Sequence, residues 1–91
     1  MTEIIINQLS QEELESKGVF QWPIWECEIS EFPWTYPEKE TCYIIEGEIE
    51  VKTDDNVVNI KPGDFVVFSA GLSCVWNVLV PVKKHYKFGS I

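Results

Sequence analysis

Apolar and polar residues alternate with a period of two along most of the chain after residue 18. The pattern is strictest at residues 48–53, where Glu48, Glu50 and Lys52 are separated by single Ile and Val residues. Such alternation buries one face of a strand and leaves the other in solvent. Short runs of strand-forming residues predict further strands at residues 25–30, 40–46, 57–60, 72–80 and 82–88, and the fully apolar residues 65–68 predict a buried strand. Short strands separated by turn residues predict an all-β barrel or sandwich.

The first 18 residues follow a different pattern. Residues 4–6 are three isoleucines, which predict a short edge strand. Ser10 followed three residues later by Glu13 is a capping box, in which the two side chains bind free backbone N–H groups of the first helical turn. Gly18 supplies the left-handed residue that ends a helix. We therefore expect one short helix before the barrel.

Glycine and proline divide the predicted strands. Gly47 is expected to break the strand that begins at Glu40, and Pro81 to separate the last two strands. Residues 32–37 carry two prolines, which cannot donate to a β-ladder and so place this aromatic segment at an edge or bend.

The chain length of 91 residues suits a single domain, here residues 1–91, with the strand and helix in 1–18 and the barrel in 19–88. No apolar run approaches the ~20 residues of a membrane span, and residues 1–7 do not resemble a signal peptide. We expect a cytoplasmic protein. The net charge of −8 argues against nucleic acid and anionic membranes as partners, because both require a basic surface.

Three cysteines, Cys27, Cys42 and Cys74, are present without a CxxC spacing. A disulfide framework or zinc knuckle is therefore not expected, and buried reduced thiols are the default.

Two blocks of sequence resemble the signature motifs of the cupin superfamily. Glu40 and Gly47 hold the glutamate-to-glycine spacing of the first motif, and Gly63 and Gly71 match two glycines of the second. More narrowly, the chain resembles the small single-domain cupins grouped with ureidoglycine aminohydrolase-like proteins, the DUF861 group. The segments that carry this resemblance are Trp34 with Tyr36, residues 43–48, 61–66, 71–76 and 84–86. The resemblance implies a conical, jelly-roll β-barrel over residues 19–88.

The resemblance also indicates which of the cupin metal ligands this chain lacks. In cupins the first motif has two histidines, here replaced by Trp34 and Tyr36, and the second has one, here replaced by Cys74. Glu40 is the one ligand retained. Two donors are too few for a stable zinc site. His85 would supply a third, giving a Glu/Cys/His set, but it lies among lysines whose charge disfavours a cation. We expect no metal and no other cofactor.

The same resemblance implies that the side chains of Trp34, Tyr36, Glu40 and Cys74 point into the mouth of the barrel. Glu40 among aromatic rings either acts as a general acid or base, or simply accepts hydrogen bonds from a Tyr hydroxyl or Trp N–H. Cys74 is either a small packed hydrophobe or a nucleophile activated by a nearby cation.

Lys84 is the candidate cation, because it shares the parity of the apolar residues Val82, Tyr86 and Phe88 and so points inward. His85 has the opposite parity and is expected at the surface, although an adjacent Lys84–His85 pair at the rim could clamp a small anion. Of the tryptophans, Trp34 is expected to line the pocket and Trp76 to belong to the core.

These observations support two hypotheses. The first is a cupin without a full metal site that binds a small polar or anionic metabolite through Trp34, Tyr36, Glu40, Cys74, Lys84 and His85. The second is a hydrolase or isomerase of nitrogenous or carbohydrate metabolites, with Glu40 as acid or base and Cys74 assisting. A regulatory or structural module is the third. In each case we expect a homodimer, formed through an edge strand.

Overall fold

A single curved antiparallel sheet makes up most of the molecule in the computed structural model, which describes residues 4–54 and 56–89. Its strands are β1 (Ile4–Asn7), β2 (Ile24–Cys27), β3 (Ser30–Thr35), β4 (Glu40–Lys52), β5 (Val57–Ile60), β6 (Phe65–Phe68) and β7 (Ser73–Phe88). The helix α1 (Gln11–Ser16) and the 3-10 turn η1 (Val19–Gln21) lie between β1 and β2.

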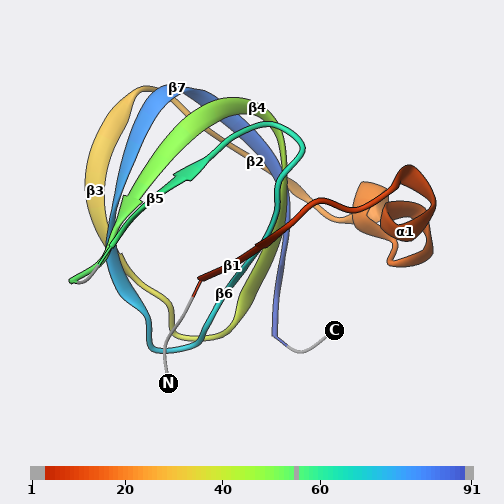
Figure 1. Ribbon diagram of the computed structural model, residues 1–91, viewed down its shortest axis with the longest axis horizontal. Coiled ribbons are helices and arrows are strands. Elements are labelled where there is room, and N and C mark those ends of the chain that lie inside the picture. Colours follow the sequence, from red (N-terminus) through yellow and green to blue (C-terminus); the bar gives the residue numbers. More distant parts are fainter. Residues whose placement is uncertain (1–3, 55, 90–91) are drawn as a thin grey trace.

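The two long strands β4 and β7 form the centre of this sheet. They pair along almost their whole length, from Glu40 opposite Phe88 to Lys52 opposite Val75. The first half of β4 also pairs with β6, which in turn pairs with β1, while its second half pairs with β5. The two halves of β7 pair with β3 and then β2. The sheet thus wraps around a common interior (Figure 1).

The predicted all-β barrel with a short N-terminal helix is confirmed. The hydrogen-bonded path runs β1-β6-β4-β7-β2 and does not close on itself. The predicted edge strand at residues 4–6 is also confirmed, since β1 is the first strand of this path.

The predicted breaks at Gly47 and Pro81 are wrong, because β4 and β7 each run through them. The two residues instead form a bend, at which the β4–β7 register shifts. Gly47 has φ +100°, and a Cβ there would lie 2.6 Å from the Cα of Val82 and closer still to the Pro81 carbonyl oxygen. Pro81 is tolerated within β7 because neither β2 nor β3 pairs with residues 79–81.

The helix covers part of the outer face of the sheet. Its capping box is confirmed: the Glu13 N–H donates to Ser10 Oγ at 3.2 Å, and the Ser10 N–H donates to Glu13 Oε1 at 3.1 Å. Gly18 has φ +75°, as predicted for the helix end. Leu14 is buried against Val19 and Phe65 in a small apolar cluster outside the barrel.

The main core fills the barrel interior. Its members in β4 change from even to odd positions across the bend at Gly47, from Cys42 and Ile44 to Ile49 and Val51. Further buried members come from β5, β6 and β7 and include Ile60, Val66, Phe68, Trp76 and Val78. The strand predicted at residues 25–30 is shorter than expected, since β2 ends at Cys27 and β3 begins at Ser30. Ile29 lies between the two strands and is 66% exposed, so the predicted alternation does not continue to that residue.

Candidate functional site: an aromatic pocket around a buried ion pair

A pocket of about 240 Å³ lies among the side chains of β2, β3, β4 and β7. It is lined by Trp25, Phe32, Trp34, Tyr36, Glu40, Trp76, Lys84, Tyr86 and Phe88. Seven of these nine residues are aromatic, and the other two are the carboxylate and the ammonium group of one ion pair. The pocket therefore combines a flat apolar lining with a single charged pair.

The alternation of side chains between the two faces of each strand explains how these residues meet. Phe32 and Trp34 share one face of β3, and the same face continues to Tyr36 just beyond the strand. On β3 and β7, Phe32 lies opposite Trp76 and Trp34 opposite Cys74. Residues opposite each other in an antiparallel pair project to the same side, so both strands direct these side chains into the barrel.

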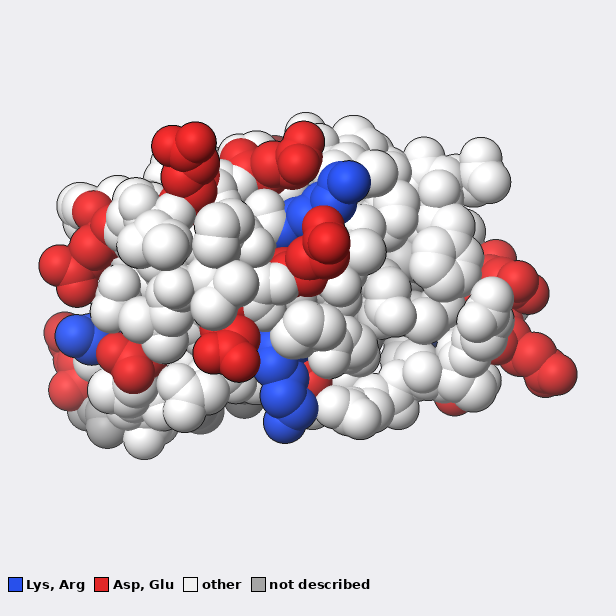
Figure 2. All heavy atoms as spheres, turned by 90° about the horizontal axis from the view of Figure 1, so that it is seen from above, with Lys and Arg blue, Asp and Glu red and all other residues white. Residues whose placement is uncertain are grey.

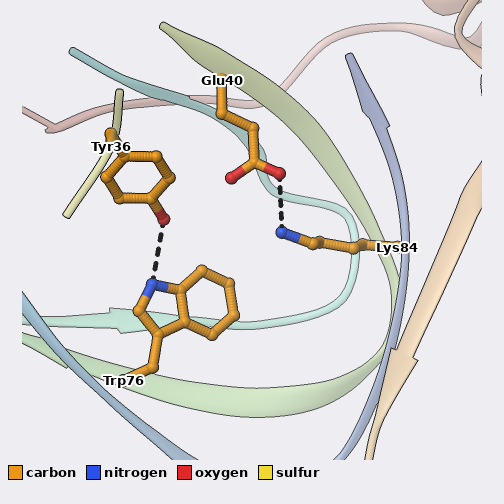
Figure 3. Close-up of polar contacts among 4 residues, drawn as sticks. All are labelled: Tyr36, Glu40, Trp76 and Lys84. Atoms are coloured by element: carbon orange, nitrogen blue, oxygen red, sulfur yellow. Dashed lines mark hydrogen bonds and ion pairs between the residues drawn. The ribbon is translucent and has the colours of Figure 1, made fainter. Parts of the chain in front are cut away.

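Backbone hydrogen bonds fix the position of Tyr36. Its N–H donates to the Leu72 carbonyl oxygen at 2.9 Å, and its own carbonyl accepts from the Gly71 N–H at 2.7 Å. The Tyr36 ring is fully buried and stacks on Phe68, with ring centroids 4.8 Å apart. Its hydroxyl oxygen accepts a hydrogen bond from Trp76 Nε1 at 3.0 Å (Figure 3).

Glu40 and Lys84 form an ion pair in the pocket wall, with 2.9 Å between Lys84 Nζ and Glu40 Oε2 (Figure 3). Their side chains are 4% and 6% exposed, respectively. The prediction that Lys84 points inward is thus confirmed. The hydrogen-bond partner of Glu40 is neither of the two expected, because the Tyr36 hydroxyl and the Trp76 N–H bind each other instead.

Two tryptophan rings lie close to the Lys84 ammonium group. Nζ lies 4.9 Å from the ring centroid of Trp25 and 4.6 Å from that of Trp76. Both distances are within the range of cation–π attraction, which stabilises a cation over an indole face. Lys84 is therefore held by one carboxylate and two rings.

Burial and the Glu40 charge keep the neighbouring groups in their neutral forms. Burial, and then the Glu40 carboxylate, raise the pKa of the Tyr36 hydroxyl far above its ordinary value. Burial raises the pKa of the Cys42 thiol to about 12, although Lys84 opposes this shift. Tyr36 and Cys42 are thus uncharged at neutral pH.

Cys74 is buried in the core and is not among the residues that line the pocket. Burial, and then Glu40, raise the pKa of its thiol, while the indole of Trp76 opposes the shift. A nucleophilic cysteine requires a lowered pKa. The activation by Lys84 that the nucleophile hypothesis requires is not found, because the Lys84 ammonium binds Glu40 instead.

His85 lies outside the pocket. Its Nδ1 is 3.0 Å from the Trp22 carbonyl oxygen, and its ring packs against Phe20. Adjacent residues of a strand project to opposite faces, so Lys84 and His85 do not form the expected clamp. The expectation of a surface histidine is also wrong, since η1 and the residues after it cover His85 and leave it 8% exposed.

The donor set does not fit a metal ion of the kind that cupins hold. Trp34 and Tyr36 replace two histidines, and neither an indole nor a neutral phenol is a suitable donor. His85 cannot join Glu40, because the two lie on opposite faces of the sheet. Across residues 4–54 and 56–89, no three His, Cys, Asp or Glu side chains are grouped to hold a metal ion.

Part of the pocket lining was missed by the sequence predictions. Trp25, Phe32, Tyr86 and Phe88 line the pocket, and Trp76 both lines it and belongs to the core. The signal was available, because Phe32 has the parity of Trp34, and Tyr86 and Phe88 have that of Lys84. Trp34 itself lies at the pocket opening and is 43% exposed.

The outer surface is acidic. Figure 2 shows carboxylate side chains spread over one face of the molecule with few lysines between them, in keeping with the net charge of −8. In the described part of the chain, no helix has the length and apolarity needed to cross a membrane.

Comparisons with known proteins agree with this fold. The sequence profile of the EutQ-like cupin domain matches residues 14–86. A DUF861 family protein from Thermotoga maritima superposes with a TM-score of 0.92 at 49% identity, over 94% of this chain and 99% of that one. No curated protein matches the sequence.

Two more distant structures share the fold alone. A putative ethanolamine utilization protein Q from Salmonella typhimurium is 20% identical, with a TM-score of 0.67 over 94% of this chain and 68% of that one. The EutQ protein of Clostridium difficile is 19% identical, with a TM-score of 0.68 over 97% of this chain and 68% of that one.

Proposed function

Since the chain belongs to the EutQ-like cupin (DUF861) family and has an aromatic pocket where other cupins hold a metal ion, we propose that it binds one small polar or anionic metabolite there. The family resemblance inferred from the motifs around Glu40 and Gly71 is confirmed by the profile match and by the 49% identical relative. Glu40 and Lys84 are the polar contacts in this proposal. The aromatic side chains around them hold the apolar part of the ligand.

The observation that carries this proposal is the placement of a buried ion pair in the wall of an open pocket. Two charges removed from water stabilise a fold no better than well-packed apolar residues of the same volume. Concave, mostly apolar sites with a few convergent polar groups are the usual form of a ligand pocket. The volume of about 240 Å³ lies below the range of about 300–1,000 Å³ that holds drug-sized ligands, so the ligand is small.

The second candidate function is an enzyme in which Glu40 acts as acid or base. It is favoured by the presence of a carboxylate in the pocket lining. It is supported less well than binding, because Lys84 occupies one oxygen of Glu40 and the pKa of Cys74 is raised. Replacing Glu40 by Gln would abolish turnover of a substrate if this second function holds.

A ligand screen tests the binding proposal. Thermal unfolding of the purified protein, with metal content measured first, is followed in the presence of small acids, amides and sugars. A ligand at about 100 times its dissociation constant adds about 2.7 kcal/mol to the free energy of unfolding. We expect at least one class to stabilise the wild type but not a Trp34→Ala/Tyr86→Ala variant. Absence of any stabilisation across the screen would contradict the proposal.

A further inference from the structure

We infer that the ligand of this pocket is electrically neutral and flat, with a hydrogen-bond donor and an acceptor side by side on one edge, as in a cyclic amide. This inference rests on the proposed function and narrows it. It starts from the hydrogen-bonding capacity that remains in the pocket once the internal contacts are counted.

Glu40 retains an unused acceptor. Its Oε2 accepts from Lys84, and within the described residues no group donates to its Oε1. Glu40 lines the pocket. Among the described residues, Thr41 Oγ1 is the fully buried side-chain polar atom without a partner, so Glu40 Oε1 is not sealed off from the pocket. A carboxylate oxygen facing a pocket with aromatic walls gains most from a ligand N–H or O–H.

Two groups that can donate hydrogen bonds, the Lys84 ammonium group and the Tyr36 hydroxyl, lie near this acceptor. The Lys84 ammonium group has three N–H donors, of which one is directed to Glu40. The Tyr36 hydroxyl accepts from Trp76, and in the described part of the chain its own proton has no acceptor. A ligand carbonyl can bind either donor while an adjacent ligand N–H binds Glu40. Figure 3 shows the Glu40 carboxylate and the Lys84 ammonium group side by side, facing the Tyr36 hydroxyl.

Electrostatics disfavour a charged ligand at this position. The charges of Glu40 and Lys84 cancel within 2.9 Å, so the pair attracts neither an anion nor a cation at a distance. A ligand carboxylate would meet the Glu40 carboxylate, and a ligand ammonium group would meet that of Lys84. Like charges in a desolvated site repel strongly, because the local dielectric is low. A neutral edge with one donor and one acceptor avoids both repulsions.

The aromatic lining selects a flat ligand. Phe32 and Trp76 are stacked, with an interplanar angle of 19°, and Trp25 meets Trp76 at 82°. Trp34 is half-exposed at the opening, where its ring can cover a bound ring. Stacking on aromatic side chains is available to any planar ring, because every such ring has a π-face.

The test uses four single-ring probes of similar size. 2-Pyridone is neutral and carries an N–H next to a C=O, N-methyl-2-pyridone lacks the donor, benzoate is an anion and benzylammonium is a cation. Binding is measured by NMR, as changes in the chemical shifts of the tryptophan indole N–H groups of ¹⁵N-labelled protein. Trp25, Trp34 and Trp76 report on the pocket, and Trp22, which belongs to the cluster outside the barrel, is the internal control.

We expect 2-pyridone to shift the three pocket signals in a saturable way and to leave Trp22 unchanged. N-methyl-2-pyridone should bind at least about tenfold more weakly, as expected when a hydrogen bond to a charged group is lost. Benzoate and benzylammonium should also bind at least about tenfold more weakly, because each carries the same charge as one member of the Glu40–Lys84 pair. Benzoate binding more tightly than 2-pyridone, or equal affinities for the two pyridones, would overturn the inference.

Two variants distinguish a change in ligand preference from a loss of folding. Glu40→Gln leaves the Lys84 charge without its counter-ion, so the preference should reverse toward benzoate. Glu40→Leu/Lys84→Met keeps an apolar wall of similar volume and should remove the tenfold difference between the two pyridones. Glu50→Gln, in the exposed pair with Lys52, is the matched control and should bind as the wild type does. A double variant that still discriminates between the pyridones would overturn the inference.

The outcomes also distinguish this inference from the proposal on which it rests. If benzoate or benzylammonium is bound and 2-pyridone is not, the inference fails and the binding function stands. If none of the four probes moves a pocket signal, the inference fails, and the binding function fails only if the broader ligand screen is also negative.

Discussion

A buried carboxylate is stable only where a cation or several hydrogen bonds replace the water that it has lost. Glu40 meets this condition through Lys84, and Lys84 meets it through Glu40 and the rings of Trp25 and Trp76. Removing one member of such a pair leaves the other charge buried and uncompensated. At the scale of single residues, the pair therefore has to be treated as a unit.

Lys84→Met should lower the free energy of unfolding by about 3–5 kcal/mol, because the Glu40 carboxylate would lose its counter-ion. Urea unfolding at pH 7 measures this loss. The matched control is Lys52→Met, which removes an exposed ion pair with 3.8 Å between Lys52 Nζ and Glu50 Oε1 and should change stability by at most about 1 kcal/mol. Adding Glu40→Leu to Lys84→Met should recover most of the loss. Equal effects of Lys84→Met and Lys52→Met would contradict this account.

The three thiols should differ in reactivity. Cys42 and Cys74 are buried with raised pKa values, whereas Cys27 is half-buried, with its Sγ 3.4 Å from Ser30 Oγ. Since the thiolate is the reactive form, a disulfide reagent such as DTNB at pH 8 should modify Cys27 first. Cys42 and Cys74 should react only after the addition of urea. Rapid modification of Cys74 in a Cys27→Ser variant would instead support its role as a nucleophile.

At the scale of elements, the bend shared by β4 and β7 turns one sheet into a barrel. On one side of the bend β4 pairs with β6, and on the other with β5. Gly47 allows the bend because the β7 backbone passes where its side chain would be. The conformation of one residue thus decides whether the two halves of the sheet can face a common interior.

Gly47→Ala should destabilise the fold by several kcal/mol. Gly63→Ala is a matched control, since Gly63 has φ +92° but nothing lies within 4 Å of its added Cβ. Backbone strain at positive φ alone costs about 1–3 kcal/mol. The excess loss in Gly47→Ala over Gly63→Ala, measured by urea unfolding, isolates the steric contact with Pro81 and Val82. Equal losses at the two positions would mean that this contact relaxes freely.

At the scale of the whole molecule, the buried thiols and the buried Tyr36 hydroxyl make the free energy of unfolding depend on pH. The folded state raises the pKa of Cys42 from 9.0 to about 12, so the folded protein retains a proton that the unfolded chain releases above pH 9. The stabilisation is complete below pH 9 and is lost as the pH rises toward 12. The pKa of Tyr36 and that of Cys74 are shifted in the same direction.

Wild-type protein should therefore lose stability between pH 9 and 11 more steeply than a Cys42→Ala variant does. One titrating group contributes up to about 1.4 kcal/mol per pH unit to this slope. The variant is less stable at every pH because of the cavity it creates, so the measurement compares slopes of the unfolding free energy. Parallel curves would show that Cys42 does not titrate differently in the folded and unfolded states.

The oligomeric state is also decided at this scale, and the homodimer stays a prediction. β1 is the terminal strand of the sheet path, and Ile5 is exposed on it. Sedimentation should give twice the chain mass of 10.5 kDa. Ile5→Lys should reduce this to the monomer by placing a charge on the edge strand, whereas Val57→Lys on β5 should not. A wild-type protein that sediments as a monomer would contradict the prediction.

Much of the fold followed from local chemistry. Short apolar runs, most of them alternating with polar residues, located β4 through β7. The capping box of Ser10 and Glu13 located α1, and the parity of Lys84 placed it inside the barrel. These predictions succeeded because each depends on neighbours a few residues apart, whose geometry the backbone dictates. The continuity of β4 and β7 did not follow, because it depends on where other strands stop pairing.

The sequence by itself determined the all-β fold, the inward parity of Lys84 and the loss of the cupin histidines at Trp34, Tyr36 and Cys74. Only the tertiary structure decided how those inward-facing residues pair. Glu40 and Lys84 are 44 positions apart, and nothing local indicates that they meet, or that Trp76 binds Tyr36 and leaves Glu40 to Lys84. Periodicity states which side of a strand a residue faces, whereas the bend and the register decide which residue it touches.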